Sequence, residues 1–234
     1  MPNILVIDTS TEACSVALQV GEAIYSDYQV APRQHGELVL PMVDALLEQA
    51  QIKLTDLDVI GYGQGPGAFT GLRICISIVQ GLAYGAGVPV VGVSSLQAMA
   101  QAAFQVTGEE HILSAIDARM GEVYWGVYQW QDGLMRLVGE EEVAEPESVT
   151  IDQLDSSIVY RAVGSGWQTY PDQLAQRAGV SLVIEQEASF PNAQHMLPWV
   201  AMQFEDGLAV DAEKAQPIYL RNNVAKKVAE QGKA

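Results

Sequence analysis

Short apolar runs alternate along the chain with stretches in which apolar residues recur at every third or fourth position, a pattern that predicts an α/β fold. Three strands are expected within residues 3–30, and Gly21-Glu22 is expected to turn the last two into a hairpin. The pattern then predicts helices at 36–51, 70–84 and 94–105, with buried strands at 59–63 and 88–93.

After residue 105 the pattern starts again. ILSAID at 112–117 repeats the form of ILVID at 4–8, and a second hairpin is expected around Gln131-Asp132-Gly133. The elements expected after it are strands at 158–163 and 182–187 and helices at 170–178 and 192–206. The repeat predicts two tandem domains, 1–105 and 106–234, each a mixed sheet with helices. The C-terminal segment is expected to be able to pack back on the first domain.

A glycine-rich stretch, GQGPGAFTGLRICIS, occupies residues 63–77. It lacks the lysine of a P-loop, because Leu72 and Arg73 follow Gly71 where a Gly-Lys-Ser run would be needed. The free backbone N–H groups at the start of the helix could still hold a phosphate, although a turn required by packing is favoured. The helix that begins in this stretch is apolar almost all round, and Gly81 and Gly85 lower its helix propensity. Such a helix is typical of a core, but equally of a surface that is partly covered by a second protein.

Charge and composition exclude several classes of function. The chain has 234 residues, 49 % of them hydrophobic, and a formal net charge of −17, which argues against unaided binding to a nucleic-acid backbone. The one basic cluster is Arg221, Lys226 and Lys227. The start of the chain lacks the basic region of a secretion signal, no apolar run is long enough for a membrane span, and two cysteines fit a reducing compartment. We expect a cytoplasmic protein that does not enter a membrane.

The sequence shows no complete catalytic constellation. His35, His111 and His195 are too far apart in the chain to form a metal-binding pair on one helix, and there is no nucleophile elbow. Asp8-Thr9-Ser10-Thr11 could hold phosphate oxygens or simply form a turn. The acidic run 140–142 is expected to be solvated, and the large aromatic residues are expected to pack in the sheet: Trp125, Tyr128 and Trp130.

Five motifs together resemble the TsaB family, also called YeaZ, over essentially the whole chain. They are I-D-T-S-T at 7–11, G-x-G-P-G-x-F-T-G-L-R-I at 63–74, P-V-x-G-V-S-S-L-x-A at 89–98, I-D-A-R-x-x-E-V-Y at 116–124 and P-x-Y-L-R-N at 217–222. Two residues depart from the family pattern: Ala68 stands where serine is usual, and Cys75 where glycine is usual.

The resemblance implies a fold of two tandem actin-like (ribonuclease H-like) ATPase-type domains. It also implies a non-catalytic partner of TsaD, the catalytic subunit that forms N6-threonylcarbamoyladenosine in tRNA next to the anticodon. A TsaE-type ATPase would join the larger complex, the chain alone would form a homodimer, and contact with tRNA would be indirect. The TsaD-like metal motif, two histidines four residues apart, falls on Ser95 and Met99. These side chains cannot replace two imidazoles, so we expect neither a metal nor the transfer chemistry in this chain.

The superfamily's nucleotide site is expected to be degenerate, and no cofactor is predicted. Its first phosphate motif has no glycine here, its second carries Arg119 where glycine is usual, and its adenosine motif retains two glycines. The residues of this degenerate site are Asp8, Thr9, Ser10, Thr11, Asp117, Gly164 and Gly166.

The resemblance also predicts that helices 36–51 and 70–84 carry the partner surface, shared by TsaD and by a second copy of the chain. The expected contact residues are Val39, Val43, Leu46, Leu72, Cys75, Ile78, Val79 and Leu82.

Two other functions stay open from the sequence. The chain could bind or hydrolyse ATP as an actin-like small-molecule kinase, or it could be an interaction protein outside tRNA modification. Such proteins also carry an older glycoprotease-like label. Protease activity would need a nucleophile–base pair or a metal site, and this sequence shows neither.

Overall fold

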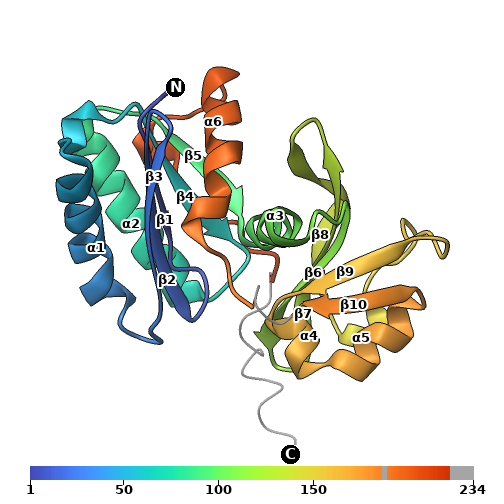
Figure 1. Cartoon of the computed structure of the whole chain (residues 1–234). Coiled ribbons are helices and arrows are strands. Elements are labelled where there is room, and N and C mark those ends of the chain that lie inside the picture. The colour runs from blue at the N-terminus through green and yellow to red at the C-terminus, as the bar shows by residue number, and fades with distance from the viewer. Residues whose placement is uncertain (186–188, 222–234) are drawn as a thin grey trace, which may run out of the picture.

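The computed structural model describes residues 1–185 and 189–221, which form two five-stranded sheets side by side (Figure 1). The first sheet has the order β3-β2-β1-β4-β5 and the second β10-β9-β6-β7-β8. The strands are β1 (Ile4–Asp8), β2 (Ala13–Val20), β3 (Ala23–Val30), β4 (Val59–Gly65), β5 (Val90–Ser94), β6 (His111–Arg119), β7 (Glu122–Gln131), β8 (Leu134–Ala144), β9 (Val159–Val163) and β10 (Ser181–Glu185).

Both sheets are mixed in the same way. In each, three consecutive strands form antiparallel pairs. A fourth strand then pairs in parallel with the first of them, and a fifth pairs in parallel with the fourth. This confirms the internal repeat that the sequence indicates and the predicted fold class of two tandem actin-like domains. The proposed boundary after residue 105 stays a prediction; helix α3 continues to Thr107.

Helices cover the faces of both sheets. They are α1 (His35–Ala50), α2 (Phe69–Ala86), α3 (Ser95–Thr107), α4 (Ser165–Thr169), α5 (Pro171–Ala178) and α6 (Leu197–Glu205), with 3-10 turns η1 (Leu54–Asp56), η2 (Pro146–Ser148), η3 (Ala193–Met196) and η4 (Ala212–Lys214). The short helix α4 has no counterpart among the predicted elements. Helix α3 lies between the two sheets, and α1 and α2 form the outermost layer on the far side of the first sheet (Figure 1).

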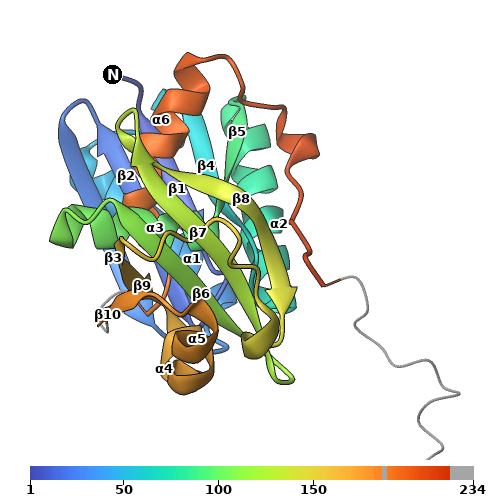
Figure 2. The same cartoon turned by 90° about the vertical axis from the view of Figure 1, so that its right-hand side faces the viewer.

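The end of the described chain returns to the first sheet. Residues of η3 and α6 pack against β1, β4 and β5 in one core cluster. The contact is close, because a Cβ atom at Gly61 of β4 would lie 2.4 Å from Cγ2 of Val200. Beyond α6, residues 208–221, which we call the strap, pair with β5 through Val90 and Val210 and then pass along α2 (Figure 2). The segment therefore packs on the first sheet and on α2.

Helix α2 is the one described helix that is long and apolar enough to cross a membrane by length and composition. Five of its side chains are buried in the structure: Leu72, Cys75, Ile76, Val79 and Ala83. Core helices pass the same test of length and composition, so the test is weak evidence for a span.

Candidate functional site

The turn after β1 is buried and hydrogen-bonded within the protein. Oδ1 of Asp8 accepts hydrogen bonds from the backbone N–H of Ser10 at 3.2 Å and from its hydroxyl at 3.1 Å. Oδ2 of Asp8 is buried with no hydrogen-bond partner among the described residues. Burial raises the pKa of this carboxyl group from 3.8 to about 6, although the bonds from Ser10 oppose the rise.

The glycine-rich stretch fills the space above this turn. The hydroxyl of Thr9 donates to the backbone carbonyl of Gly71 at 2.7 Å, and the N–H of Ala68 donates to the carbonyl of Ser10 at 2.7 Å. A Cβ atom at Gly67 would lie 2.2 Å from the Ser10 carbonyl oxygen, and one at Gly71 would lie 2.0 Å from that of Thr9. The glycines therefore let two backbones approach each other. In this conformation the two backbones are in direct contact at the turn.

On the opposite side, Arg119 occupies the position of the second phosphate motif. Its guanidinium binds Asp117 at 2.8 Å and reaches across to Glu12 at 2.6 Å, which joins the second sheet to the turn after β1. The backbone of Arg119 has a φ of 62°, a conformation that is uncommon for residues other than glycine. An arginine side chain thus lies where the superfamily pattern would leave the backbone free for a nucleotide.

The two glycines of the adenosine motif serve packing. A Cβ atom at Gly164 would lie 2.2 Å from the carbonyl oxygen of Ala115, and one at Gly166 would lie 2.8 Å from the Cβ of Ala115. The next residue, Trp167, is buried and donates from Nε1 to the carbonyl of Leu113 at 3.0 Å. These contacts bring α4 against β6. Of the seven residues of the degenerate site, Ser10, Thr11 and Asp117 line one small cleft, whereas Asp8, Thr9, Gly164 and Gly166 are held in contacts within the protein.

The residues at the position of the TsaD-like metal motif do not fit a metal ion. The hydroxyl of Ser95 donates to Ser10 at 2.9 Å, and Met99 is fully buried in a hydrophobic cluster. In the described part of the chain, no group of three or more His, Cys, Asp or Glu side chains could hold a metal. The donor set gives no basis for a metal-dependent step here.

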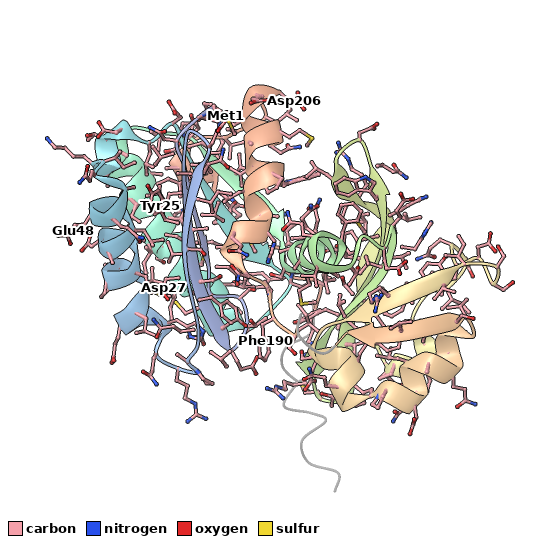
Figure 3. The ribbon with its side chains drawn as sticks, viewed as in Figure 1. Met1, Tyr25, Asp27, Glu48, Phe190 and Asp206 are labelled. Carbon is pink, nitrogen blue, oxygen red and sulfur yellow. The ribbon has the colours of Figure 1, made fainter. Side chains whose placement is uncertain are left out.

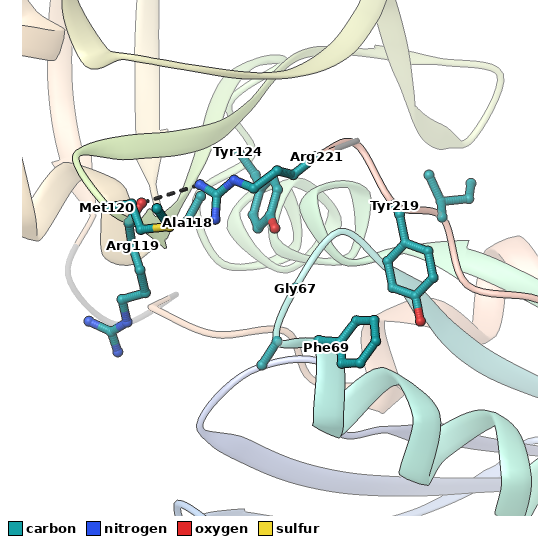
Figure 4. Close-up of a pocket in the computed structure, with 10 residues that line it drawn as sticks. Gly67, Phe69, Ala118, Arg119, Met120, Tyr124, Tyr219 and Arg221 are labelled. Carbon is teal, nitrogen blue, oxygen red and sulfur yellow. Dashed lines mark hydrogen bonds between the residues drawn. The ribbon is translucent and has the colours of Figure 1, made fainter. Parts of the chain in front are cut away.

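A small cavity opens beside this cleft. It has a volume of about 220 Å³ and lies between the start of α2, the turn from β6 to β7, and the strap. Its lining residues are Gly67, Ala68, Phe69, Ala118, Arg119, Met120, Tyr124, Ile218, Tyr219 and Arg221, and we call it the strap cavity (Figure 4). Arg221 donates to the carbonyl of Arg119 at 3.2 Å and pairs with Glu122, so the strap is tied to the second sheet. Sequence reasoning missed this cavity because its three walls are far apart in the chain.

The predicted partner residues fall on two different sides of α1 and α2. Six of the eight are buried inside the protein and are not exposed to a partner in this structure: Val39, Val43, Leu46, Leu72, Cys75 and Val79. All of them except Leu72 belong to the core between these helices and the first sheet. Ile78 and Leu82 are half-buried and pack against the edge of the same core. The sheet takes one face of each helix, and spacing alone does not tell which apolar face that is.

The face of α2 that points away from the sheet carries polar and small residues between two exposed aromatic side chains, Phe69 and Tyr84. Its exposed residues recur at helical spacing, and we call them the outer stripe: Phe69, Arg73, Ser77, Gly81, Tyr84 and Gly85. Around Gly81 and Gly85, a Cβ atom would meet nothing within 4 Å, so internal packing does not require either glycine. Tyr84 extends from the same face and is 87 % exposed. On α1, Leu40 is exposed, and so is the acidic residue Glu48, two turns further along the helix (Figure 3).

Two further expectations have different outcomes. Trp125 and Tyr128 are buried in the second sheet as predicted, and Trp130 stacks on Phe104 with ring centroids 3.6 Å apart. The acidic run is not simply solvated. The carboxylate of Glu141 accepts hydrogen bonds from Ser94 and Tyr128, and burial raises its pKa. A strand that turns its side chains alternately in and out carries Glu141 inward.

Of the predicted basic cluster, Lys226 and Lys227 lie outside the described residues, whereas Arg221 lines the strap cavity.

Comparison with known proteins shows to which family the chain belongs. The chain is 46 % identical over 223 residues to the tRNA threonylcarbamoyladenosine biosynthesis protein TsaB of Escherichia coli, covering 95 % of this chain and 96 % of that one. It is 38 % identical to TsaB of Haemophilus influenzae, with 94 % of each chain covered. The chain belongs to the TsaB family.

Two other comparisons agree with the family. The solved structure of YeaZ from Pseudomonas aeruginosa superimposes with a TM-score of 0.87 at 45 % identity, covering 94 % of this chain and all of that one. The model of the TsaD family, described as tRNA N6-adenosine threonylcarbamoyltransferase, matches residues 22–231. A TsaB-family chain is thus similar in sequence to the transferase family itself, yet here the metal motif holds Ser95 and Met99.

Proposed function

We propose that this chain is a non-catalytic partner of a TsaD-type catalytic subunit in the formation of N6-threonylcarbamoyladenosine in tRNA next to the anticodon. Its family gives it a role in tRNA threonylcarbamoyladenosine biosynthesis. The observation that carries the partner role is the outer stripe of α2, in which Gly81 and Gly85 adjoin open space.

Glycine in a helix interior costs about 1 kcal/mol relative to alanine. Two glycines in α2 that no internal contact requires therefore lower the stability of the isolated chain. Small residues at i, i+4 and i+8, here Ser77, Gly81 and Gly85, leave a flat surface on which a second helix can lie at close range. Tyr84 beside them is the type of side chain that anchors protein interfaces.

The cleft supports a role without catalysis of its own. The turn at Asp8 is filled by the glycine-rich stretch, Arg119 lies in the second phosphate motif, and Ser95 is hydrogen-bonded to Ser10. These contacts also weigh against the alternative of an ATP-binding or ATP-hydrolysing small-molecule kinase. Independent nucleotide binding would require the glycine-rich stretch to move away from the turn. Calorimetry of the isolated chain with ATP and Mg²⁺ should show no micromolar affinity.

The same outer stripe is proposed to form a homodimer when the chain is alone, so that TsaD and a second copy exclude each other. A two-fold pair places the same patch on both sides. A TsaE-type ATPase would join the complex of the chain with TsaD. Because the net charge is −17, we propose that tRNA is bound by the partners and only indirectly by this chain.

A reconstituted tRNA modification assay tests the role. Omission of the chain should abolish modified tRNA, and Gly81→Arg should do so at concentrations at which the unchanged chain supports full activity. Gln176→Arg, at an exposed position of α5, is the matched control because it adds the same charge on the second domain. Full modification without the chain would exclude the proposed role, and equal activity of Gly81→Arg would exclude the outer stripe as the contact.

Charged replacements of Ile78 or Leu82 are poor tests of the contact, because both side chains pack on the core and the variants would unfold in part. Gly81 and Ser77 avoid this difficulty, since they are exposed.

A further inference from the structure

The strap cavity is too small for an ordinary ligand site. Its volume of about 220 Å³ lies below the roughly 300–1,000 Å³ of most small-molecule pockets. It has room for one large side chain rather than for a nucleotide. Its walls come from the start of α2, from the β6–β7 turn of the second sheet, and from the strap, so that a group inside it touches both halves of the protein (Figure 4).

Exposed apolar side chains converge on this cavity. Phe69 and Tyr219 lie across from Met120, with Ile218 next to Tyr219, and each of the four is at least 40 % exposed (Figure 4). The rings of Phe69 and Tyr219 are 5.4 Å apart, centroid to centroid, and form one wall. Large apolar groups that gather at one exposed place mark a site of interaction with another protein.

A positive charge lies at the edge of the cavity. Cζ of Arg73 is 3.7 Å from the centroid of the Phe69 ring, and its Nε donates to the hydroxyl of Tyr219 at 3.4 Å. The salt bridges found among the described residues do not include Arg73. The chain has 29 acidic and 12 basic residues, so a guanidinium that faces solvent beside an apolar cavity favours a carboxylate from outside.

The cavity continues the outer stripe. Phe69 belongs to both, and Arg73 of the outer stripe lies over its ring, because α2 begins at the cavity wall and runs away from it. A partner that lies along Ser77, Gly81 and Gly85 therefore reaches the cavity at the N-terminal end of the helix.

We propose that the protein that covers the outer stripe of α2 inserts one large apolar side chain into the strap cavity and places a carboxylate beside it against Arg73. This inference rests on the proposed function, in which that protein is the TsaD-type subunit. The inserted side chain contacts Met120 in the β6–β7 turn and Phe69 at the start of α2, so binding fixes the two halves in one relative position.

The two exposed methionines provide the test. Met120 at the cavity is 76 % exposed, and Met1 at the other end of the first sheet is 79 % exposed (Figure 3). Mild peroxide should oxidise both at similar rates in the isolated chain, which mass spectrometry follows residue by residue. Saturation with a TsaD-type subunit should slow oxidation of Met120 at least tenfold and leave Met1 unchanged.

The outcomes separate the two proposals. If no complex forms, both fail. If the complex forms and Met120 is oxidised as fast as in the isolated chain, the cavity is not occupied. The partner role then stands, and the proposed insertion of a side chain is wrong. Protection of both methionines alike would indicate general shielding and would also overturn the inference.

Variants give a second readout. Arg73→Glu should weaken binding of the TsaD-type subunit at least tenfold. Lys53→Glu is the control and should have little effect on binding, because it makes the same change of charge at an exposed site outside the cavity lining. Tyr219→Ala should weaken binding and Tyr219→Phe should retain most of it. Equal affinity of Arg73→Glu and the unchanged chain would contradict the carboxylate contact.

Discussion

Gly63 of β4 lies directly over the carboxylate of Asp8, so that a Cβ atom at position 63 would stand 1.7 Å from Oδ2. Gly63→Ala should therefore lower the free energy of unfolding by about 1–3 kcal/mol, as overpacking in a core does. Urea denaturation measures the change. Gly36→Ala on α1 is the control, since a Cβ atom there meets nothing within 4 Å and stability should be equal or higher. A Gly63→Ala protein as stable as the control would show that Asp8 can move aside.

The raised pKa of Asp8 predicts a pH dependence of stability. The pKa is about 6 in the folded chain and near 3.8 when unfolded, so the folded state holds the proton more tightly between these values. The free energy of unfolding should therefore fall as pH rises from 4 to 7, by about 2–3 kcal/mol from this group. Asp8→Asn should remove this part of the slope. Other carboxylates titrate in the same range, so the measurement is the difference between the two proteins, and identical slopes would refute the assignment.

Gly81→Ala should have opposite effects on folding and on association. The alanine favours the helix by about 0.5–1 kcal/mol and meets no atom of the chain, so thermal unfolding of the isolated protein should shift upward. The added methyl group would hold a partner helix away, so sedimentation should show a weaker homodimer and a weaker complex with the TsaD-type subunit. Higher stability together with unchanged association would place the contact elsewhere.

Cys14 and Cys75 should be unreactive in the folded protein. Both are buried, burial raises the pKa of Cys14 to about 12, and burial raises that of Cys75 well above its usual value. The thiolate is the reactive form, so a thiol reagent at pH 8 should label neither residue in native buffer and both in denaturant. Rapid labelling of Cys75 without denaturant would reveal opening of α2 from the sheet, since its Sγ lies 3.2 Å from the carbonyl oxygen of Ile7.

The sequence predicts the elements of this fold better than it predicts their orientation. The repeated strand–hairpin pattern and the helix spacing depend on local periodicity, and both sheets follow them. In α2, however, apolar residues occupy nearly every side, so Leu72 and Cys75 could not be told from outward positions before the sheet was placed. The open space around Gly81 is likewise a tertiary property that no local pattern contains.

In the cleft too, the sequence predicts some features and misses others. The missing glycine at Asp8–Thr11 and the arginine at position 119 indicate a degenerate nucleotide site from residue types alone. That Gly67 and Gly71 themselves fill the turn is visible only when the two segments meet. The acidic run 140–142 is expected to be a solvated end that follows a strand, yet it lies within β8, which carries Glu141 to the hydroxyl groups of Ser94 and Tyr128.

The return of α6 to the first sheet has a consequence for synthesis on the ribosome. Ile4 and Val6 of β1 are covered on one side by Met196, Leu197 and Val200, which leave the exit tunnel last among these residues. At about 5–20 residues per second, roughly 10–40 s separate the two ends of this contact. During that interval the nascent first sheet has one apolar face without its native cover, which makes this face a natural substrate for a chaperone that meets the growing chain.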